Sequence, residues 1–197
     1  MYTREQIETA VKSKGYKWFS DDSNKGFDVN IVGVRTSSTG QTVTNVFDDY
    51  LTISYKENGV WKFNSWQNTT DPGKKGVMEY HNVDGVARLV EGQYSGSHII
   101  RLHQGKYEAL CQDKPVKVYR DANKDMVYNE SKITEGVYGI NIHKAGVDST
   151  YVENWSEGCQ VFKKSADFDS FMLICKKAAS IHGNTFTYTL IESSDIK

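Results

Sequence analysis

Long apolar runs, proline and cysteine are all scarce in this chain. No stretch approaches the roughly 20 consecutive apolar residues that a membrane-spanning helix needs, so we expect no membrane partner. The two prolines fall outside the centres of the strands expected below. Three cysteines, an odd number without a C-x-x-C pair, do not indicate a disulfide framework. Cys111, Cys159 and Cys175 are therefore each either a small buried apolar residue or a nucleophile.

An excess of charge of either sign is also missing. Lys and Arg number 24, Asp and Glu number 25, and the formal net charge of the 197 residues is -1. Without a basic patch nothing would neutralise a phosphate backbone, which argues against nucleic acid as a partner. Residues 1–19 are polar and lack the apolar stretch of a secretory signal. We therefore expect synthesis in the cytoplasm, or a periplasmic location reached by a signal that has been removed.

The beginning of the chain instead has a helical pattern. Thr3 and Gln6 have the spacing of a capping box, apolar residues recur at helical spacing after them, and Gly15 is a stop signal. A short helix is expected over about residues 4–14.

From residue 28 onward the pattern changes to short β-branched and aromatic runs separated by Gly, Asn and Asp. Two alternating runs, 50–55 and 60–63, flank a Gly-ended turn and predict a hairpin. Residues 68–85 are expected to form a long loop. The other expected strands are 29–36, 43–47, 86–91, 97–103, 107–111, 116–120, 136–143 and 185–191.

A second helix is expected over residues 167–179, where apolar side chains follow a 3.6-residue period and Ser165 or Asp167 offers an N-cap. Two helices and many short strands together predict a mainly β, β-rich α+β fold. Residues 1–90 form a β-rich N-terminal part, either integral to the domain or a small appendage. Residues 91–197 carry the candidate chemistry.

A histidine and a cysteine in this second part are the most informative residues. His143 ends an apolar strand, and sixteen positions later Cys159 occupies a Ser-x-Gly-Cys turn before another apolar run. A cysteine needs an imidazole or an electropositive setting to act as a nucleophile. Ser156 would hold the turn or bind substrate, and the amides of Gly158 and Cys159 would face a developing oxyanion. Taken singly, His143 and Cys159 are each more often structural, and only their combination favours catalysis.

The arrangement resembles the histidine and Ser-x-Gly-Cys signature of the L,D-transpeptidase (YkuD-like) catalytic domain. The resemblance implies an L,D-transpeptidase-like β-sandwich with a helix after the cysteine segment. It also implies that Cys159 attacks a carbonyl of the peptidoglycan stem peptide to form an acyl-enzyme, that His143 is its base, and that Ser156 and Gly158 support the site. Uncharacterised phage and Bacteroidetes proteins are similar in three segments: 139–143, 154–162 and 186–190.

Two positions depart from that family. Glu157 precedes the Gly-Cys pair, where the family commonly has His or Arg, and Val161 stands where it commonly has Arg or Asn. We expect Arg120, or else Arg101, to make the contact with a substrate carboxylate instead. Glu157 beside the thiol is expected to oppose its ionisation.

Two further residues are expected to contact substrate. Trp155 precedes the cysteine turn, and His103 ends an expected strand before a Gly turn. The alternatives for His103 are that it orients His143 or is purely structural.

The leading hypothesis is a cysteine-dependent hydrolase of peptidoglycan stem peptides, of the kind used in bacteriophage lysis, since no export signal accompanies the motif. One alternative is a true L,D-transpeptidase that forms cross-links or exchanges D-amino acids. Another is a non-catalytic cell-wall-binding or virion structural protein. In each case the expected partner is peptidoglycan.

A candidate metal loop follows one of the expected strands. Asp121, Asn123 and Asp125 match the first three ligand positions of a calcium loop. Met126 and Lys132 stand where an EF-hand has Gly and Glu, so the loop is not an EF-hand. The alternatives are a turn rich in Asx residues and a one-loop structural calcium site. No cofactor is expected to be required for the reaction.

Overall fold

Eight strands close into a single barrel in the computed structural model, which describes residues 2–36, 41–79 and 82–197. Neighbouring strands are antiparallel except for the parallel pairs β1–β11 and β9–β10. Strands from both the first 90 residues and the rest of the chain take part. Around the barrel the order is β1 (Asn30–Arg35), β11 (Phe186–Glu192), β5 (Gly92–His103), β6 (Tyr107–Gln112), β9 (Ile142–Lys144), β10 (Gln160–Phe162), β3 (Val60–Thr69) and β2 (Asp49–Glu57).

The prediction of a mainly β fold is confirmed, but the strands form a barrel where a sandwich was expected. β1 pairs with β2 on one side and with β11 on the other, so early and late strands join in one closed sheet. Closure leaves no exposed strand edge in that sheet. Short strands of regular spacing are common to sandwiches and barrels, and the choice between them depends on this long-range pairing.

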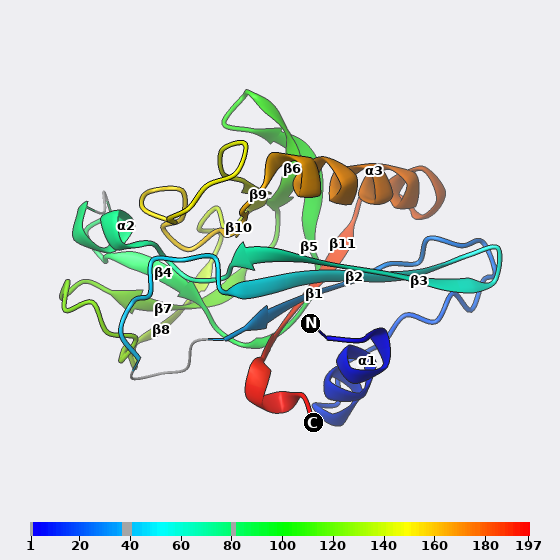
Figure 1. Cartoon of the computed structure of the whole chain (residues 1–197), viewed down its shortest axis with the longest axis horizontal. Coiled ribbons are helices and arrows are strands. Elements are labelled where there is room, and N and C mark those ends of the chain that lie inside the picture. The colour runs from blue at the N-terminus through cyan, green and yellow to red at the C-terminus, as the bar shows by residue number, and fades with distance from the viewer. Residues whose placement is uncertain (1, 37–40, 80–81) are drawn as a thin grey trace.

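A second, three-stranded sheet lies beside the barrel. It consists of β4 (Val86–Leu89), β7 (Val116–Asp121) and β8 (Ile133–Gly136) in that order, all antiparallel. In Figure 1 it lies at the lower left, next to helix α2 (Lys74–Glu79). Backbone hydrogen bonds tie β4 and α2 to a later loop: Ala87 N–H donates to Glu157 O (3.1 Å), and Gly76 N–H donates to Glu153 O (3.2 Å).

Helix α1 (Arg4–Ser13) begins with the predicted capping box. Thr3 Oγ1 accepts from Gln6 N–H (3.2 Å), and Gln6 Oε1 accepts from Thr3 N–H (3.0 Å). Its apolar face packs on β1 and β11 in a cluster that includes Ile7, Val34 and Ile191. A short 3₁₀ turn, η1 (Ser193–Asp195), ends near it, at the bottom of Figure 1.

Helix α3 (Ser165–His182) follows β10 and packs on the barrel through Phe168 and Phe171. Its N-cap is Lys164, whose side chain makes no capping bond, so the predicted cap at Ser165 or Asp167 is wrong. The helix begins at Ser165, two residues before the expected start at residue 167. Within the described part of the chain no helix is both long and apolar enough to cross a membrane.

The predicted β2–β3 hairpin is confirmed, but two other strand predictions fail locally. Residues 43–47 contribute only an isolated bridge at Val46. The expected strand 136–143 divides into the end of β8, an irregular segment of residues 137–141 that we call the strap, and β9. The expected loop 68–85 contains α2.

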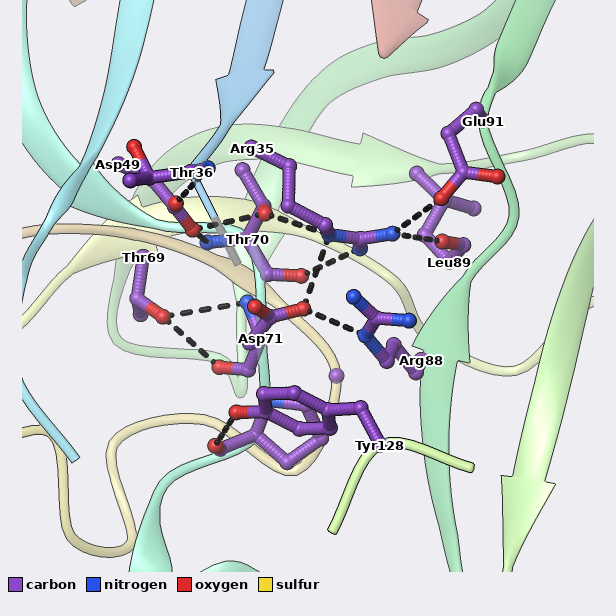
Figure 2. Close-up of polar contacts among 12 residues, drawn as sticks. Arg35, Thr36, Asp49, Thr69, Thr70, Asp71, Arg88, Leu89, Glu91 and Tyr128 are labelled. Atoms are coloured by element: carbon purple, nitrogen blue, oxygen red, sulfur yellow. Dashed lines mark hydrogen bonds and ion pairs between the residues drawn. The ribbon is translucent and has the colours of Figure 1, made fainter. Parts of the chain in front are cut away.

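A buried ion network joins the barrel to the small sheet. Arg35, at the end of β1, is fully buried and contacts Asp71 (Nε to Oδ1, 2.9 Å) and Glu91 (Nη1 to Oε1, 2.9 Å). Arg88 of β4 reaches the same oxygen of Asp71 (2.9 Å), as Figure 2 shows. Removing one member of such a network leaves an uncompensated buried charge, so the network holds the two sheets together.

Candidate active site

Strand register brings the candidate catalytic pair onto one face of β9 and β10. Ile142 pairs with Gln160, so Asn141 and Cys159 lie opposite each other. His143 follows two residues after Asn141 and therefore points to the same face. Val161 pairs with His143, so Cys159, two residues before Val161, is a diagonal neighbour of His143 on the same face of the sheet.

The sulfur of Cys159 is held by the strap. Asn141 N–H donates to Sγ (3.5 Å), and the thiol donates to Gly139 O (3.3 Å). The first contact stabilises a thiolate, whereas the second keeps the proton on sulfur. Burial raises the pKa of Cys159 to about 11, the Asn141 amide opposes this, and Cys111 and Glu157 add to it. The thiol is therefore protonated at neutral pH.

The neutral imidazole of His143 has its Nε2 free to accept a proton. Its Nδ1 lies 3.0 Å from Lys144 O. A carbonyl only accepts, so Nδ1 carries the proton and Nε2 is the acceptor of the neutral ring. The ring stacks on His103, with centroids 4.4 Å apart and planes at 18°. Burial lowers the pKa of His143 to about 4, with a smaller contribution from His103.

Asn141 links these groups and is the site residue that the sequence analysis missed. Its backbone N–H faces the sulfur of Cys159, while its Nδ2 lies 3.2 Å from Nδ1 of His103. An amide NH₂ donates, so Nδ1 of His103 accepts. The available signal was the alternation of Asn141 and His143 within an apolar strand, which places both on one face.

The turn that carries Cys159 is fixed by its own residues. Ser156 is fully buried; its Oγ donates to Cys159 O (2.8 Å) and accepts from Gly158 N–H (3.1 Å). Gly158 has a φ of +134°, and a Cβ there would lie 2.0 Å from Ala87 O of β4. Ser156 thus holds the turn, and the Gly158 amide is already used within it. The Cys159 amide, which has no acceptor among the described residues, is the remaining candidate oxyanion donor.

A cavity of about 1230 Å³ opens beside the candidate pair, and both Cys159 and His143 line it. Ser156 and Gly158 do not. The cavity also brings together the three residues that were expected to bind substrate: His103, Arg120 and Trp155. Of these, Trp155 is the most exposed, at 44%. The motif and the expected substrate contacts therefore meet at one place.

The wall of this cavity is electropositive. The one carboxylate among its described lining residues is Glu157. The basic lining residues are Arg101, Lys106, Arg120 and Lys144. Arg101 and Lys144 are paired with carboxylates outside the lining, Asp113 (3.7 Å) and Asp169 (3.3 Å), so the local excess that favours an anionic ligand depends mainly on Lys106 and Arg120.

Arg120 differs from the arginines of the ion network. Arg35 and Arg88 each contact a carboxylate, whereas no described carboxylate lies within ion-pair distance of Arg120. Its guanidinium lies 4.4 Å from the ring centroid of Tyr138 and donates to Gly85 O (3.2 Å). Its Nε is buried with no partner among the described residues. The charge of Arg120 is therefore available to a carboxylate of a ligand.

The predicted calcium residues form a series of Asx turns. Asp121 Oδ1 accepts from Asn123 N–H (3.1 Å), and Asn123 Oδ1 accepts from Asp125 N–H (2.9 Å). Asp125 Oδ1 accepts from Val127 N–H (2.8 Å). Across residues 2–36, 41–79 and 82–197, no group of three or more His, Cys, Asp or Glu side chains is arranged to hold a metal ion. The geometry fits the Asx-turn alternative, and the calcium site stays a prediction.

No protein-family model, curated protein or solved structure matches this chain. A function is therefore inferred from the geometry of the site and from the motif around Cys159.

Proposed function

We propose that this chain is a cysteine-dependent hydrolase of peptidoglycan stem peptides that acts on the bacterial cell wall. The observation that carries the proposal is the diagonal placement of Cys159 and His143 on one sheet face, at the wall of a cation-lined cavity. The L,D-transpeptidase-like motif around Cys159 supports the choice of substrate.

In the first step, Sγ of Cys159 attacks the peptide carbonyl while Nε2 of His143 takes the thiol proton. A C–S bond forms, and the Cys159 amide is the candidate donor to the new oxyanion. The C–N bond then breaks as the imidazolium returns its proton to the leaving amine. Water, deprotonated by His143, cleaves the thioester and restores the thiol.

The resting site must rearrange slightly for this step. The thiol donates its hydrogen bond to Gly139 O, whereas the proposed base is His143. Rotation about the Cys159 side chain turns the S–H group from Gly139 O towards the imidazole, which takes the proton from sulfur, while the Asn141 amide stabilises the negative charge that develops on sulfur.

The charges of the cavity fit an acidic peptide, and stem peptides carry free carboxylates. Val161, at the position where the family commonly has a polar residue, is fully buried and does not reach a ligand. Arg120, on the separate small sheet, lines the cavity, and no described carboxylate lies within ion-pair distance of its guanidinium. Arg120 is therefore the residue that binds a substrate carboxylate.

The proposal is tested with purified sacculi and defined muropeptides, using wild type, Cys159→Ala and Cys175→Ala. Cys175 is buried in α3 away from the cavity, so its variant controls for the loss of a thiol. We expect wild type and Cys175→Ala to release the same product and Cys159→Ala to release none. Mass spectrometry identifies hydrolysis by the addition of water.

Other outcomes would redirect the assignment. Full activity of Cys159→Ala would remove Cys159 as the nucleophile. Products that exchange a terminal D-amino acid or join two peptides would replace hydrolysis by L,D-transpeptidation. Sedimentation of all three proteins with sacculi, without any product, would favour a non-catalytic wall-binding or virion protein.

A further inference from the structure

The strap, residues 137–141, carries the two backbone groups that hold the sulfur of the nucleophile. They are the carbonyl of Gly139 and the amide of Asn141, at 3.3 Å and 3.5 Å from Sγ of Cys159. The strap itself has no regular secondary structure. Something other than a neighbouring strand must fix it if the sulfur is to keep one position.

Gln112, the last residue of β6, supplies that support. Its side chain is fully buried, and its Oε1 accepts from the N–H groups of Tyr138 (3.0 Å) and Ile140 (2.9 Å). Its Nε2 donates to Gly136 O (2.9 Å) and to Lys114 O (2.8 Å). The amide thus uses its two donors and both acceptor positions, and three of the four bonds hold the strap or the residue before it.

Two further contacts reinforce the same attachment. The backbone N–H of Gln112 donates to Asn141 Oδ1 (2.9 Å). His98, which pairs with Gln112 across β5 and β6, places its Nε2 2.9 Å from Ile140 O. The strap is therefore bound at Tyr138, Ile140 and Asn141 to one small region of the barrel wall, around Gln112 and His98.

We propose that Gln112 is a positioning residue of the active site, which acts through the strap to fix the sulfur of Cys159 where it attacks the substrate. The inference rests on Cys159 being the nucleophile, as proposed above. Gln112 does not contact the sulfur and does not line the cavity. Its effect on the reaction is transmitted by Gly139 and Asn141.

The test compares Gln112→Met with a matched variant, Gln93→Met. Both side chains lie in barrel strands and bond mainly to backbone groups. Gln93 accepts from Lys17 N–H (2.9 Å) and donates to Lys17 O (2.8 Å) and Thr189 Oγ1 (3.0 Å), and these partners lie outside the strap. Methionine is similar in length to glutamine and removes these hydrogen bonds with little change of shape.

Two properties are measured: kcat on a defined muropeptide, and the rate at which iodoacetamide alkylates Cys159 at a series of pH values. In Gln112→Met we expect kcat to fall at least tenfold, because the nucleophile loses its fixed position. Alkylation at pH 8 should rise several-fold, because a loosened strap admits water and the thiol pKa moves down from about 11. General loosening of the barrel would also lower kcat and raise alkylation, so the opposite changes support a positioning role only if Gln93→Met does not produce them.

The proposal is overturned if Gln112→Met keeps the wild-type kcat and alkylation profile, or if Gln93→Met changes both to the same extent. Should Gln112→Met fail to fold, Gly139→Ala replaces it. Gly139 has a φ of +75° with open space around its Cβ position, so alanine strains the strap and leaves Gln112 in place. The same opposite changes are expected there, and their absence overturns the inference. Alkylation needs no substrate, so it still reports on the strap if the proposed function fails.

Discussion

Cys159 and His143 are both uncharged at neutral pH, because burial raises the pKa of the thiol to about 11 and lowers that of the imidazole to about 4. A preformed pair of thiolate and imidazolium would need the opposite order of the two pKa values. In the proposed reaction, nucleophilic attack and proton transfer therefore occur together. The thiol is weakly reactive until a carbonyl is placed beside it.

The high pKa of the Cys159 thiol predicts how the alkylation rate of the wild-type protein depends on pH. Only the thiolate reacts with iodoacetamide, so the rate at Cys159 should climb about tenfold per pH unit from neutral pH towards pH 10. Mass mapping of the peptide that contains Cys159 measures this rate separately from any reaction of Cys111, which lines the same cavity. A rate that is already constant between pH 5 and pH 8 would mean that an ion pair exists and that the neutral assignment is wrong.

At the scale of the elements, the position of the cysteine turn depends on its close contact with β4. Gly158→Ala would place a Cβ 2.0 Å from Ala87 O, at a φ of +134° that disfavours any side chain. The turn and the strand must separate. We expect the free energy of unfolding, measured in urea, to fall by roughly 2–3 kcal/mol, and the activity to be lost with the displaced sulfur.

Gly105→Ala is the control for this prediction. Gly105, in the turn between β5 and β6, has a φ of +70°, but nothing lies within 4 Å of its Cβ position. Alanine there should cost only the backbone strain of about 1 kcal/mol. Equal losses of stability in the two variants would show that the contact with β4 does not matter.

Sequence patterns predicted the elements that depend on local signals. Thr3 and Gln6 form the expected cap of α1, and the β2–β3 hairpin follows its alternating pattern. The expected strand 136–143 failed because apolar alternation does not reveal where backbone groups find partners. In the strap those partners belong to the side chain of Gln112, which is distant in sequence.

The site was predictable to the same extent. His143 and Cys159 are close in sequence, and their pattern was sufficient to select them together. Asn141 and Gln112 were missed because their roles arise from the register between β6, β9 and β10. The stacking of His103 on His143 depends on the same register, so the sequence left its role open.

At the scale of the whole molecule, the buried ion network couples the barrel to the sheet on which the cysteine turn rests. Arg35 belongs to the barrel and Arg88 to β4, and both contact Asp71. Asp49 of β2 lies beside this cluster in Figure 2, and its carboxylate accepts the N–H groups of Thr36 (2.6 Å) and Thr70 (2.7 Å). Unlike Asp71, it has no arginine within ion-pair distance among the described residues.

Asp49 therefore makes stability depend on pH. Burial, followed by the charge of Asp71, raises the pKa of Asp49 to about 7, from 3.8 for a free side chain. The folded state holds a proton that the unfolded state has already lost. This contribution to stability is complete below pH 3.8 and disappears as the pH rises through about 7.

Asn in place of Asp49 cannot titrate, so Asp49→Asn isolates this contribution. The histidines are the same in both proteins, and their effects cancel in the difference. The free energy of unfolding of both proteins is measured by urea titration. Between pH 6 and pH 9 we expect the value for wild type to fall by about 1 kcal/mol relative to the value for Asp49→Asn. A difference that is constant or grows over that interval would mean that Asp49 is already ionised at pH 6, and that the network neutralises it more completely than its contacts indicate.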